Sequence, residues 1–194
     1  TLPANNMAEL RTWINANKGK INLANAGLGA ASHLCGLLFQ QAVAVDMATI
    51  PYKGTAPAMT DLMANQVDLM CDQTTNTSGQ IESGKIKAFG VLTQARWPGA
   101  PDIPTLDEQG LPGLAMPYWT GLWVRKGTPA KIVGKLSAAV VETMTDPAIA
   151  KRLTDLSQQI PPREQQTPQV LGAQHRAAIE KWWPIIKAAN IKVE

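Results

Sequence analysis

The sequence has few of the features that mark specialised protein classes. Its 194 residues include only two histidines and two cysteines, with no CxxC pair, so no metal site is expected. The net charge of +3 is mild and no block of like charges occurs, which argues against a nucleic-acid-binding surface. The longest apolar runs fall far short of a membrane span. We therefore expect no metal, no nucleic-acid partner and no direct membrane insertion.

Motifs of known catalytic machinery are missing as well. The sequence contains no GxSxG, no HExxH and no P-loop. His33 and Cys35 are two residues apart in a helical pattern, so their side chains point to different faces. No nucleophile with a base and an orienting acid emerges. We expect a binding protein rather than an enzyme, and no cofactor.

The start of the chain and its cysteines give weaker indications. The chain begins at Thr1 without a methionine and has no signal peptide. We interpret this start as that of a processed or trimmed product, so it does not indicate the cytoplasm.

Cys35 falls in a helical pattern and Cys71 in a strand pattern, and we interpret both as small buried hydrophobic residues. A disulfide between them is the alternative.

What the sequence does contain is the patterning of a globular α/β protein. The apolar fraction is 45% and the charged fraction 17%, which suffices for a sizeable core. Periodicity predicts strands over residues 21–25, 47–52, 67–72, 86–93 and 119–124. It predicts helices over residues 7–17, 32–43, 57–65, 79–83, 129–144, 147–156 and 168–189, with a capping box at 105–108 and a polar loop at 73–78. Because strands and helices alternate with short connections, we expect a mostly parallel sheet covered by helices.

Two glycine turns stand where a predicted strand runs into a predicted helix. At such a junction the first N–H groups of the helix have no intrahelical partner, and the helix dipole adds partial positive charge. Glycine lets a ligand approach this backbone closely. Ligands of parallel sheets bind beyond the carboxyl ends of the strands, so the turns predict a site for a small anion. The candidate ligand-binding residues are Gly27, Gly29, Ala30, Ser32, His33, Tyr52, Lys53, Gly54, Thr55, Asp72 and Thr74.

The first turn has two other interpretations. Its Gly27-x-Gly29-x-x-Ser32 spacing is similar to a dinucleotide fingerprint, but Ser32 replaces the third glycine. Asp46, at about the spacing expected of a ribose-binding acid, precedes its strand instead of ending it. We therefore favour a small-anion site over a nucleotide site. A purely structural turn capped by Ser32 is the remaining alternative.

Three polar candidates have alternatives of their own. His33 either hydrogen-bonds a bound carboxylate or has a structural role, packed or bonded to a neighbouring carbonyl. Lys53 either attracts an anion or is an ordinary solvated lysine. Asp72 would repel an anion directly, so we expect it to hold a water or to cap residues 74–76.

Three segments carry a resemblance to a known family: GLGAASHL at 27–34, PYKGTAPA at 51–58 and NQVDLMCDQTTNT at 65–77. They resemble the Bug-type solute receptors, the extracytoplasmic binding proteins of tripartite tricarboxylate transporters. The likeness continues through residues 81–88, 104–113 and 127–129, and more weakly through 182–189. It covers essentially the whole chain in the family's order.

The resemblance implies a type II periplasmic-binding-protein fold whose two lobes close on a small organic acid. Family members grip a carboxylate through backbone amides and waters, and the two turns would form one wall of that cleft. Ala30 stands where many relatives have serine, which removes one hydroxyl donor. The implied partners are a small carboxylate and the membrane subunits of the transporter, and the implied location is the periplasm.

Members of this family are longer, which implies that the amino-terminal part of one lobe is absent here. We expect residues 1–117 to form the complete lobe, and 118–194 to be a returning strand and helices of the other, incomplete lobe. Solute binding would then be weakened or absent, and exposed apolar surface on the tail helices would favour a homodimer or strand exchange. An α/β enzyme acting on a nucleotide or acyl substrate, or a truncated interaction module without binding, stays open.

Overall fold

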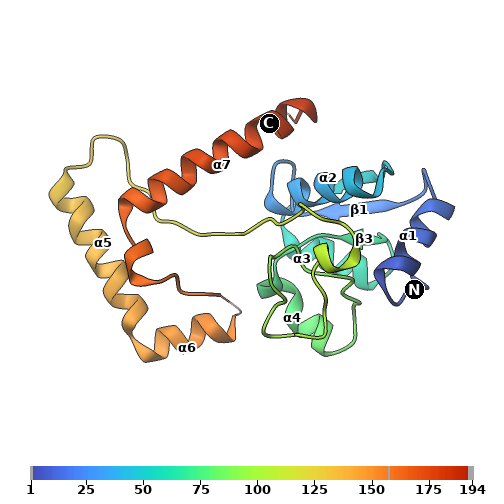
Figure 1. Cartoon of the computed structure of the whole chain (residues 1–194), viewed down its shortest axis with the longest axis horizontal. Coiled ribbons are helices and arrows are strands. Elements are labelled where there is room, and N and C mark those ends of the chain that lie inside the picture. The colour runs from blue at the N-terminus through green and yellow to red at the C-terminus, as the bar shows by residue number, and fades with distance from the viewer. Residues whose placement is uncertain (1, 157, 192–194) are drawn as a thin grey trace. The chain divides into compact units, whose positions relative to one another are not determined.

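The computed structural model describes residues 2–156 and 158–191, which fall into two compact units. One unit contains the chain up to Tyr118 together with Ile191, and the other contains Trp119–Asn190. Figure 1 shows that the strands belong to the first unit, whereas the second is built from helices and irregular chain.

The first unit is organised around a parallel three-stranded sheet in the order β2-β1-β3. In the register, Asn25 lies opposite Pro51 and Ala24 lies opposite Met70. Each strand is followed by a helix, as the alternating pattern predicts. The elements in chain order are β1 (Asn22–Asn25), α2 (Ala31–Val43), β2 (Ala48–Pro51), α3 (Thr55–Met63), β3 (Leu69–Met70) and α4 (Thr74–Glu82).

Successive residues of β1 face opposite sides of the sheet, so each face has its own core. Leu23 lies on the side covered by α2, where a Cβ added to Gly36 would meet the Leu23 side chain. Ala24 packs with Ala58 of α3 and with Val67 on the other side. The sheet is therefore sandwiched between helices, and α2 and α3 can be followed on either side of β1 in Figure 1.

Helix α1 (Met7–Ala16) closes the first core. Met7, Leu10 and Ile14 recur at the spacing of one helical face and are buried. The helix begins at Asn6, whose side chain accepts a hydrogen bond from the Glu9 N–H at 2.9 Å. These features confirm the helix that periodicity predicts here.

The predicted polar loop at residues 73–78 is wrong, because this segment forms most of α4. The expected short helix at 79–83 is the second half of the same element. Its threonine-, serine- and asparagine-rich sequence has low intrinsic helix propensity. Such side chains compete with the backbone for hydrogen bonds. The Thr77 hydroxyl instead donates to the Gln73 carbonyl one turn earlier, which is compatible with the helix.

The predicted strand at residues 86–93 is also wrong. The segment makes a single parallel bridge between Val91 and Thr105. The neighbouring chain contains Pro101 and Pro104, which have no N–H to extend a ladder. The Phe89 carbonyl is instead taken by the Gln109 side chain at 2.7 Å. The capping box at 105–108 is confirmed, with Thr105 and Glu108 bonding each other's backbone N–H at the short helix η1 (Asp107–Gln109).

The third wrong prediction is the strand at residues 119–124, which is irregular chain. A strand needs a partner for its N–H and C=O groups, and the described residues of the second unit contain no other strand. The segment packs on a helix instead: a Cβ added to Gly121 would meet Leu171, and the rings of Trp119 and Trp123 lie edge-on to His175.

The second unit consists of helices that confirm the predicted periodicities. They are α5 (Ala130–Thr145), α6 (Pro147–Asp155), η2 (Arg163–Gln165) and α7 (Pro168–Ala188), with Pro184 inside α7. None of the described residues of this unit is fully buried. Among the described residues of the whole chain, no helix is both long and apolar enough to cross a membrane.

Candidate functional site

Three helices begin at one edge of the sheet. Because β1, β2 and β3 are parallel, their carboxyl ends share an edge, and α2, α3 and α4 start just beyond these ends. The candidate residues lie in these three connections or in the first turn of the helix that follows. The structure therefore gathers the predicted turns at the edge where parallel sheets bind ligands.

None of these three helices has a side-chain cap. Their N-cap residues are Ala30, Gly54 and Gln73, and no cap side chain accepts from the first N–H groups of the helices. By contrast, α1, α6 and α7 are capped by the side chains of Asn6, Asp146 and Thr167. The helix starts at the sheet edge thus keep N–H groups that an anion can accept from.

The first turn satisfies several of its N–H groups internally. The Gly27 N–H donates to Asn25 Oδ1 at 2.9 Å, and the Gly29 N–H donates to His33 Nδ1 at 3.0 Å. The Ala30 N–H donates to the Gly27 carbonyl at 3.1 Å. Gly27 and Gly29 have φ angles of +132° and +78°, which favour glycine. These residues give the turn its shape, and the donors left at its end are the first N–H groups of α2.

Ser32 and His33 are buried and engaged within this turn. Ser32 Oγ accepts from the Ala26 N–H at 2.9 Å, so its hydroxyl proton remains for another partner. His33 accepts at Nδ1 from a backbone N–H, whereas one of our alternatives had it bonded to a carbonyl. The neutral ring then carries its proton on Nε2. Burial lowers the pKa of His33 below its ordinary value, which favours this neutral form.

The second turn is tied to the first by main-chain bonds. The Tyr52 N–H donates to the Asn25 carbonyl at 2.9 Å, and the Gly54 N–H donates to the Ala26 carbonyl at 3.2 Å. The Tyr52 hydroxyl donates to Asp61 Oδ2 at 2.7 Å. This hydrogen bond, with burial and the carboxylate charge, raises the pKa of Tyr52. Lys53 is exposed beside the turn, as a lysine that attracts anions from solution would be.

The third connection is organised by Asp72. Its Oδ1 accepts from the Gln73 N–H at 2.7 Å and from Asn76 Nδ2 at 3.2 Å. The same Asn76 amide reaches Thr55 Oγ1 at 3.5 Å, so the starts of α3 and α4 are neighbours. Thr74 is the first residue of α4. One carboxylate oxygen of Asp72 therefore holds this connection in place.

Two residues of this edge were not among the candidates. Asn76 links the two helix starts, but it lies in the segment that we expected to be a loop. Asn25 is only 2% exposed, and its Nδ2 has no hydrogen-bond partner among the described residues. Its place as the last residue of a strand, just before a glycine turn, was the signal that could have found it.

Cys35 and Cys71 form a disulfide, so the interpretation as two free hydrophobic residues is wrong. Cys35 lies in the second turn of α2 and Cys71 follows β3 directly, next to Asp72. Their Cα atoms are 6.0 Å apart, which is within the range of disulfides. The pairing depends on α2 lying close to the end of β3, and a sequence does not display that contact.

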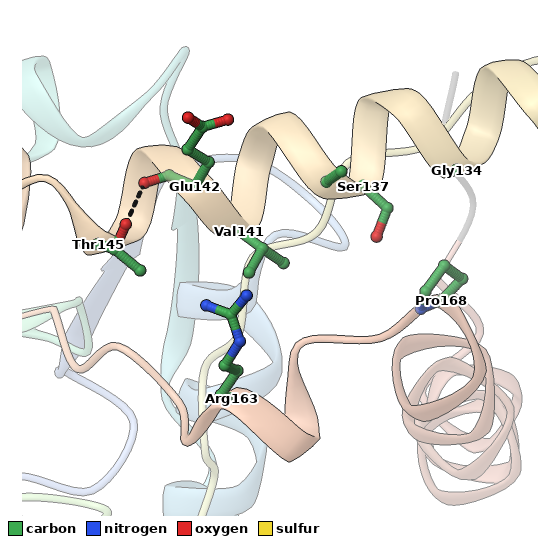
Figure 2. Close-up of a pocket in the computed structure, with 8 residues that line it drawn as sticks. Gly134, Ser137, Val141, Glu142, Thr145, Arg163 and Pro168 are labelled. Carbon is green, nitrogen blue, oxygen red and sulfur yellow. Dashed lines mark hydrogen bonds between the residues drawn. The ribbon is translucent and has the colours of Figure 1, made fainter.

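The second unit has a separate pocket that contains none of the candidate residues. Figure 2 shows it between α5 and the start of α7, with the guanidinium of Arg163 directed toward α5 near Val141. Its lining residues are Gly134, Ser137, Ala138, Val141, Glu142, Thr145, Arg163 and Pro168. Within the part of the chain that the structure describes, no cluster of histidine, cysteine, aspartate and glutamate is suited to a metal.

A parallel sheet with open helix starts at its carboxyl edge offers N–H donors and partial positive charge at one place. The sequence matches the family described as "Tripartite tricarboxylate transporter family receptor" over residues 1–191. The chain therefore belongs to that family, as the resemblance implied. It is 39% identical over 183 residues to a UPF0065 protein of Agrobacterium vitis, covering 94% of this chain and 53% of that protein.

Solved structures agree with the family assignment. The fold is similar to that of the periplasmic binding protein BugD, with a TM-score of 0.90 and 45% identity over 99% of this chain and 64% of that one. It is also similar to MatC from Rhodopseudomonas palustris with bound malate, with a TM-score of 0.90 and 36% identity over 96% of this chain and 63% of that one. The α/β fold class of a periplasmic binding protein is confirmed. The chain spans about half the length of the Agrobacterium relative and under two thirds of these structures.

Proposed function

We propose that this protein binds a small organic carboxylate as the extracytoplasmic receptor of a tripartite tricarboxylate-type transporter. The observation that carries the proposal is the set of three uncapped helix starts at the carboxyl edge of one parallel sheet. Membership of the receptor family and the malate bound to its relative MatC support the same ligand class.

In this proposal the ligand carboxylate accepts hydrogen bonds from the first N–H groups of α2 and α3. Each helix start contributes partial positive charge, which stabilises an anion without a buried counter-ion. The Ser32 hydroxyl and His33 Nε2–H supply further donors, since both side chains act as acceptors in the hydrogen bonds within the turn. Gly27, Gly29, Ala30 and Gly54 shape the backbone that presents these groups.

The second and third connections complete the proposed site. Lys53, exposed beside Tyr52, draws anions toward the edge by long-range attraction. Thr55 and Thr74 add hydroxyls at the starts of α3 and α4. Asp72 positions its connection through Gln73 and Asn76, so its role is to hold the backbone rather than to touch the carboxylate.

The proposed location is the periplasm, and the proposed protein partners are the membrane subunits of the transporter. The Cys35–Cys71 disulfide supports an oxidising compartment. The structurally similar BugD is a periplasmic binding protein, which supports the same location for this chain.

The experiment is a titration of the ¹⁵N-labelled protein with malate, followed by amide NMR shifts. NMR detects millimolar affinities, so it reports binding even where the chain supplies only part of a cleft. We expect shifts at Ala31, Ser32, Thr55 and Ala56, the first residues of α2 and α3. The neutral diamide of malic acid is the matched control and should leave these signals in place.

Two outcomes would contradict the proposal. If none of malate, succinate and citrate shifts any signal, the proposal that the chain binds these carboxylates is wrong. Shifts caused by nicotinamide nucleotides alone would favour the nucleotide-using enzyme instead. Thermal unfolding with the same ligands gives an independent readout, because a ligand that binds only the folded protein raises its Tm.

A further inference from the structure

Asn25 holds the two glycine turns together. It is the last residue of β1, and only 2% of its surface is exposed. Its main-chain carbonyl accepts from the Tyr52 N–H of the second turn at 2.9 Å. Its side-chain Oδ1 accepts from the Gly27 N–H of the first turn, also at 2.9 Å. One residue thus bonds both connections at the sheet edge.

The remaining polar group of this side chain is unsatisfied. Nδ2 of Asn25 is buried and has no hydrogen-bond partner among the described residues. Rotating the amide by half a turn would not solve this, because Nδ2 would then face the Gly27 N–H and two donors would meet. The bond from Gly27 therefore determines the orientation and leaves a buried N–H donor open. Buried donors in native proteins are nearly always paired.

The open donor lies at the same edge as the uncapped start of α2. Because Oδ1 reaches the Gly27 N–H, the whole carboxamide points out of the strand into the turn that leads to Ala31. The two side-chain acceptors of that turn do not bond Nδ2: Ser32 Oγ accepts from the Ala26 N–H, and His33 Nδ1 accepts from the Gly29 N–H. Since no atom of the described residues accepts from Nδ2, an acceptor brought by a bound ligand would satisfy it.

We propose that Asn25 Nδ2 is a ligand-binding donor that hydrogen-bonds a carboxylate oxygen held at the start of α2. This inference rests on the proposed function and adds a specificity-determining side chain to it. A neutral amide donor accepts no proton and gives none up, so it favours an oxygen acceptor at any pH near neutrality. An aspartate here would keep the bond from Gly27 but place a second negative charge beside the ligand.

The test compares the wild-type protein with Asn25→Asp in malate titrations followed by NMR. In the wild type we expect the side-chain NH₂ pair of Asn25, which is identified by its absence from N25D, to shift together with the backbone amides of Ala31 and Ser32. In N25D the affinity should fall by about 10- to 100-fold, as expected for a lost hydrogen bond to a charged group. Asn15→Asp adds the same charge on the exposed side of α1, and its affinity should stay near that of the wild type.

The outcomes separate this inference from the function on which it rests. If the amides of Ala31 and Ser32 shift but the Asn25 NH₂ pair does not, and N25D binds malate as N15D does, Asn25 is not a ligand donor although the carboxylate site stands. If no signal shifts in the wild type, both the proposed carboxylate binding and the donor role of Asn25 are contradicted. If N25D does not fold, the NH₂ pair is assigned in the wild type by through-bond correlation to the Asn25 backbone, and its shift on adding malate still decides the matter.

Discussion

His33 shows how a single side chain shapes this site. It accepts a hydrogen bond from the Gly29 N–H through Nδ1 while buried under the turn. A protonated ring has no free acceptor, so protonation has to break this bond. The position of Gly29 in the turn therefore depends on His33 being neutral.

This dependence predicts how stability changes with pH. Burial lowers the pKa of His33 below its ordinary 6.5, so the unfolded chain binds more protons than the folded one as the pH falls below about 6.5. The contribution of His33 is fully present above that pH and is lost as the pH falls through the lowered folded-state pKa. Urea unfolding at a series of pH values should show this decline.

The matched variants for this prediction are His33→Asn and His175→Asn. Asparagine at position 33 keeps an acceptor for Gly29 but does not titrate, so the decline below pH 6.5 should become smaller. The H175N variant removes the exposed histidine of α7 and is the comparison for the loss of a histidine elsewhere in the chain. Equal profiles for H33N and the wild type would show that His33 is not the titrating group.

The sequence predicts where the turns lie but not which atoms accept from their N–H groups. The glycine pattern and the strand-to-helix junctions are local, and they pointed to the turns around Gly27 and Gly54. That Gly27 and Gly29 donate to Asn25 and His33 depends on rotamers chosen by packing. The unpaired Nδ2 of Asn25 is visible only once every neighbouring atom has been placed.

Among the elements, α2 is held to the sheet by a covalent bond as well as by packing. The Cys35–Cys71 disulfide joins its second turn to the end of β3. The closed loop includes β2 and α3, so the bond removes many conformations from the unfolded chain. It also places the start of α2 relative to Asp72 and the start of α4.

Replacing both cysteines should therefore destabilise the protein. We expect Cys35→Ala with Cys71→Ala to lower the free energy of unfolding by about 2–4 kcal/mol, measured by urea denaturation. A reductant should lower the stability of the wild type by a similar amount and leave the double variant unchanged. A reductant that affects both proteins equally would mean that the disulfide is not the cause.

Helix α1 offers a second prediction about an element. Ile14 has no exposed surface and belongs to the same core as Leu10. Ile14→Ala should reduce the free energy of unfolding by about 2–5 kcal/mol, because it leaves a cavity in addition to the lost transfer energy. Ala8→Gly on the exposed face of α1 tests helix propensity alone and should cost about 1 kcal/mol. Similar losses in the two variants would show that Ile14 is not a core residue.

The two strands that were predicted wrongly share a physical cause. Helices α1, α2 and α3 were predicted because apolar periodicity and the residues that begin and end helices are properties of short stretches. Residues 86–93 and 119–124 have strand-like sequences, but whether they pair depends on distant partners. Residues 86–93 make a single bridge beside Pro101 and Pro104, which have no N–H to extend it. Residues 119–124 pack on α7 instead of pairing.

In the whole molecule, the second unit exposes much apolar surface. None of its described residues is fully buried, and several of its large hydrophobic side chains are well exposed. These are Leu122, Trp123, Val124, Ile132, Leu136, Ile149, Leu156, Val170, Ile179 and Trp183. Exposed apolar area of this kind favours association.

We predict that the chain self-associates through the helices of this unit. Light scattering should give a mass that rises with concentration, and an apolar dye should bind. Leu136→Lys with Ile179→Lys places charges on α5 and α7 and should reduce both effects, whereas Lys18→Glu near the end of α1 should not. A monodisperse monomer without dye binding would contradict the prediction of a homodimer.

The order of residues was enough to predict the glycine turns, the helical periodicities, the α/β class and the family, because each is written in short stretches of chain. The sheet order, the disulfide, the extent of α4 and the open donor of Asn25 were not predictable in this way. They arise where segments far apart in the chain meet, and the hydrogen bonds and close packing made there are settled by folding the whole unit together.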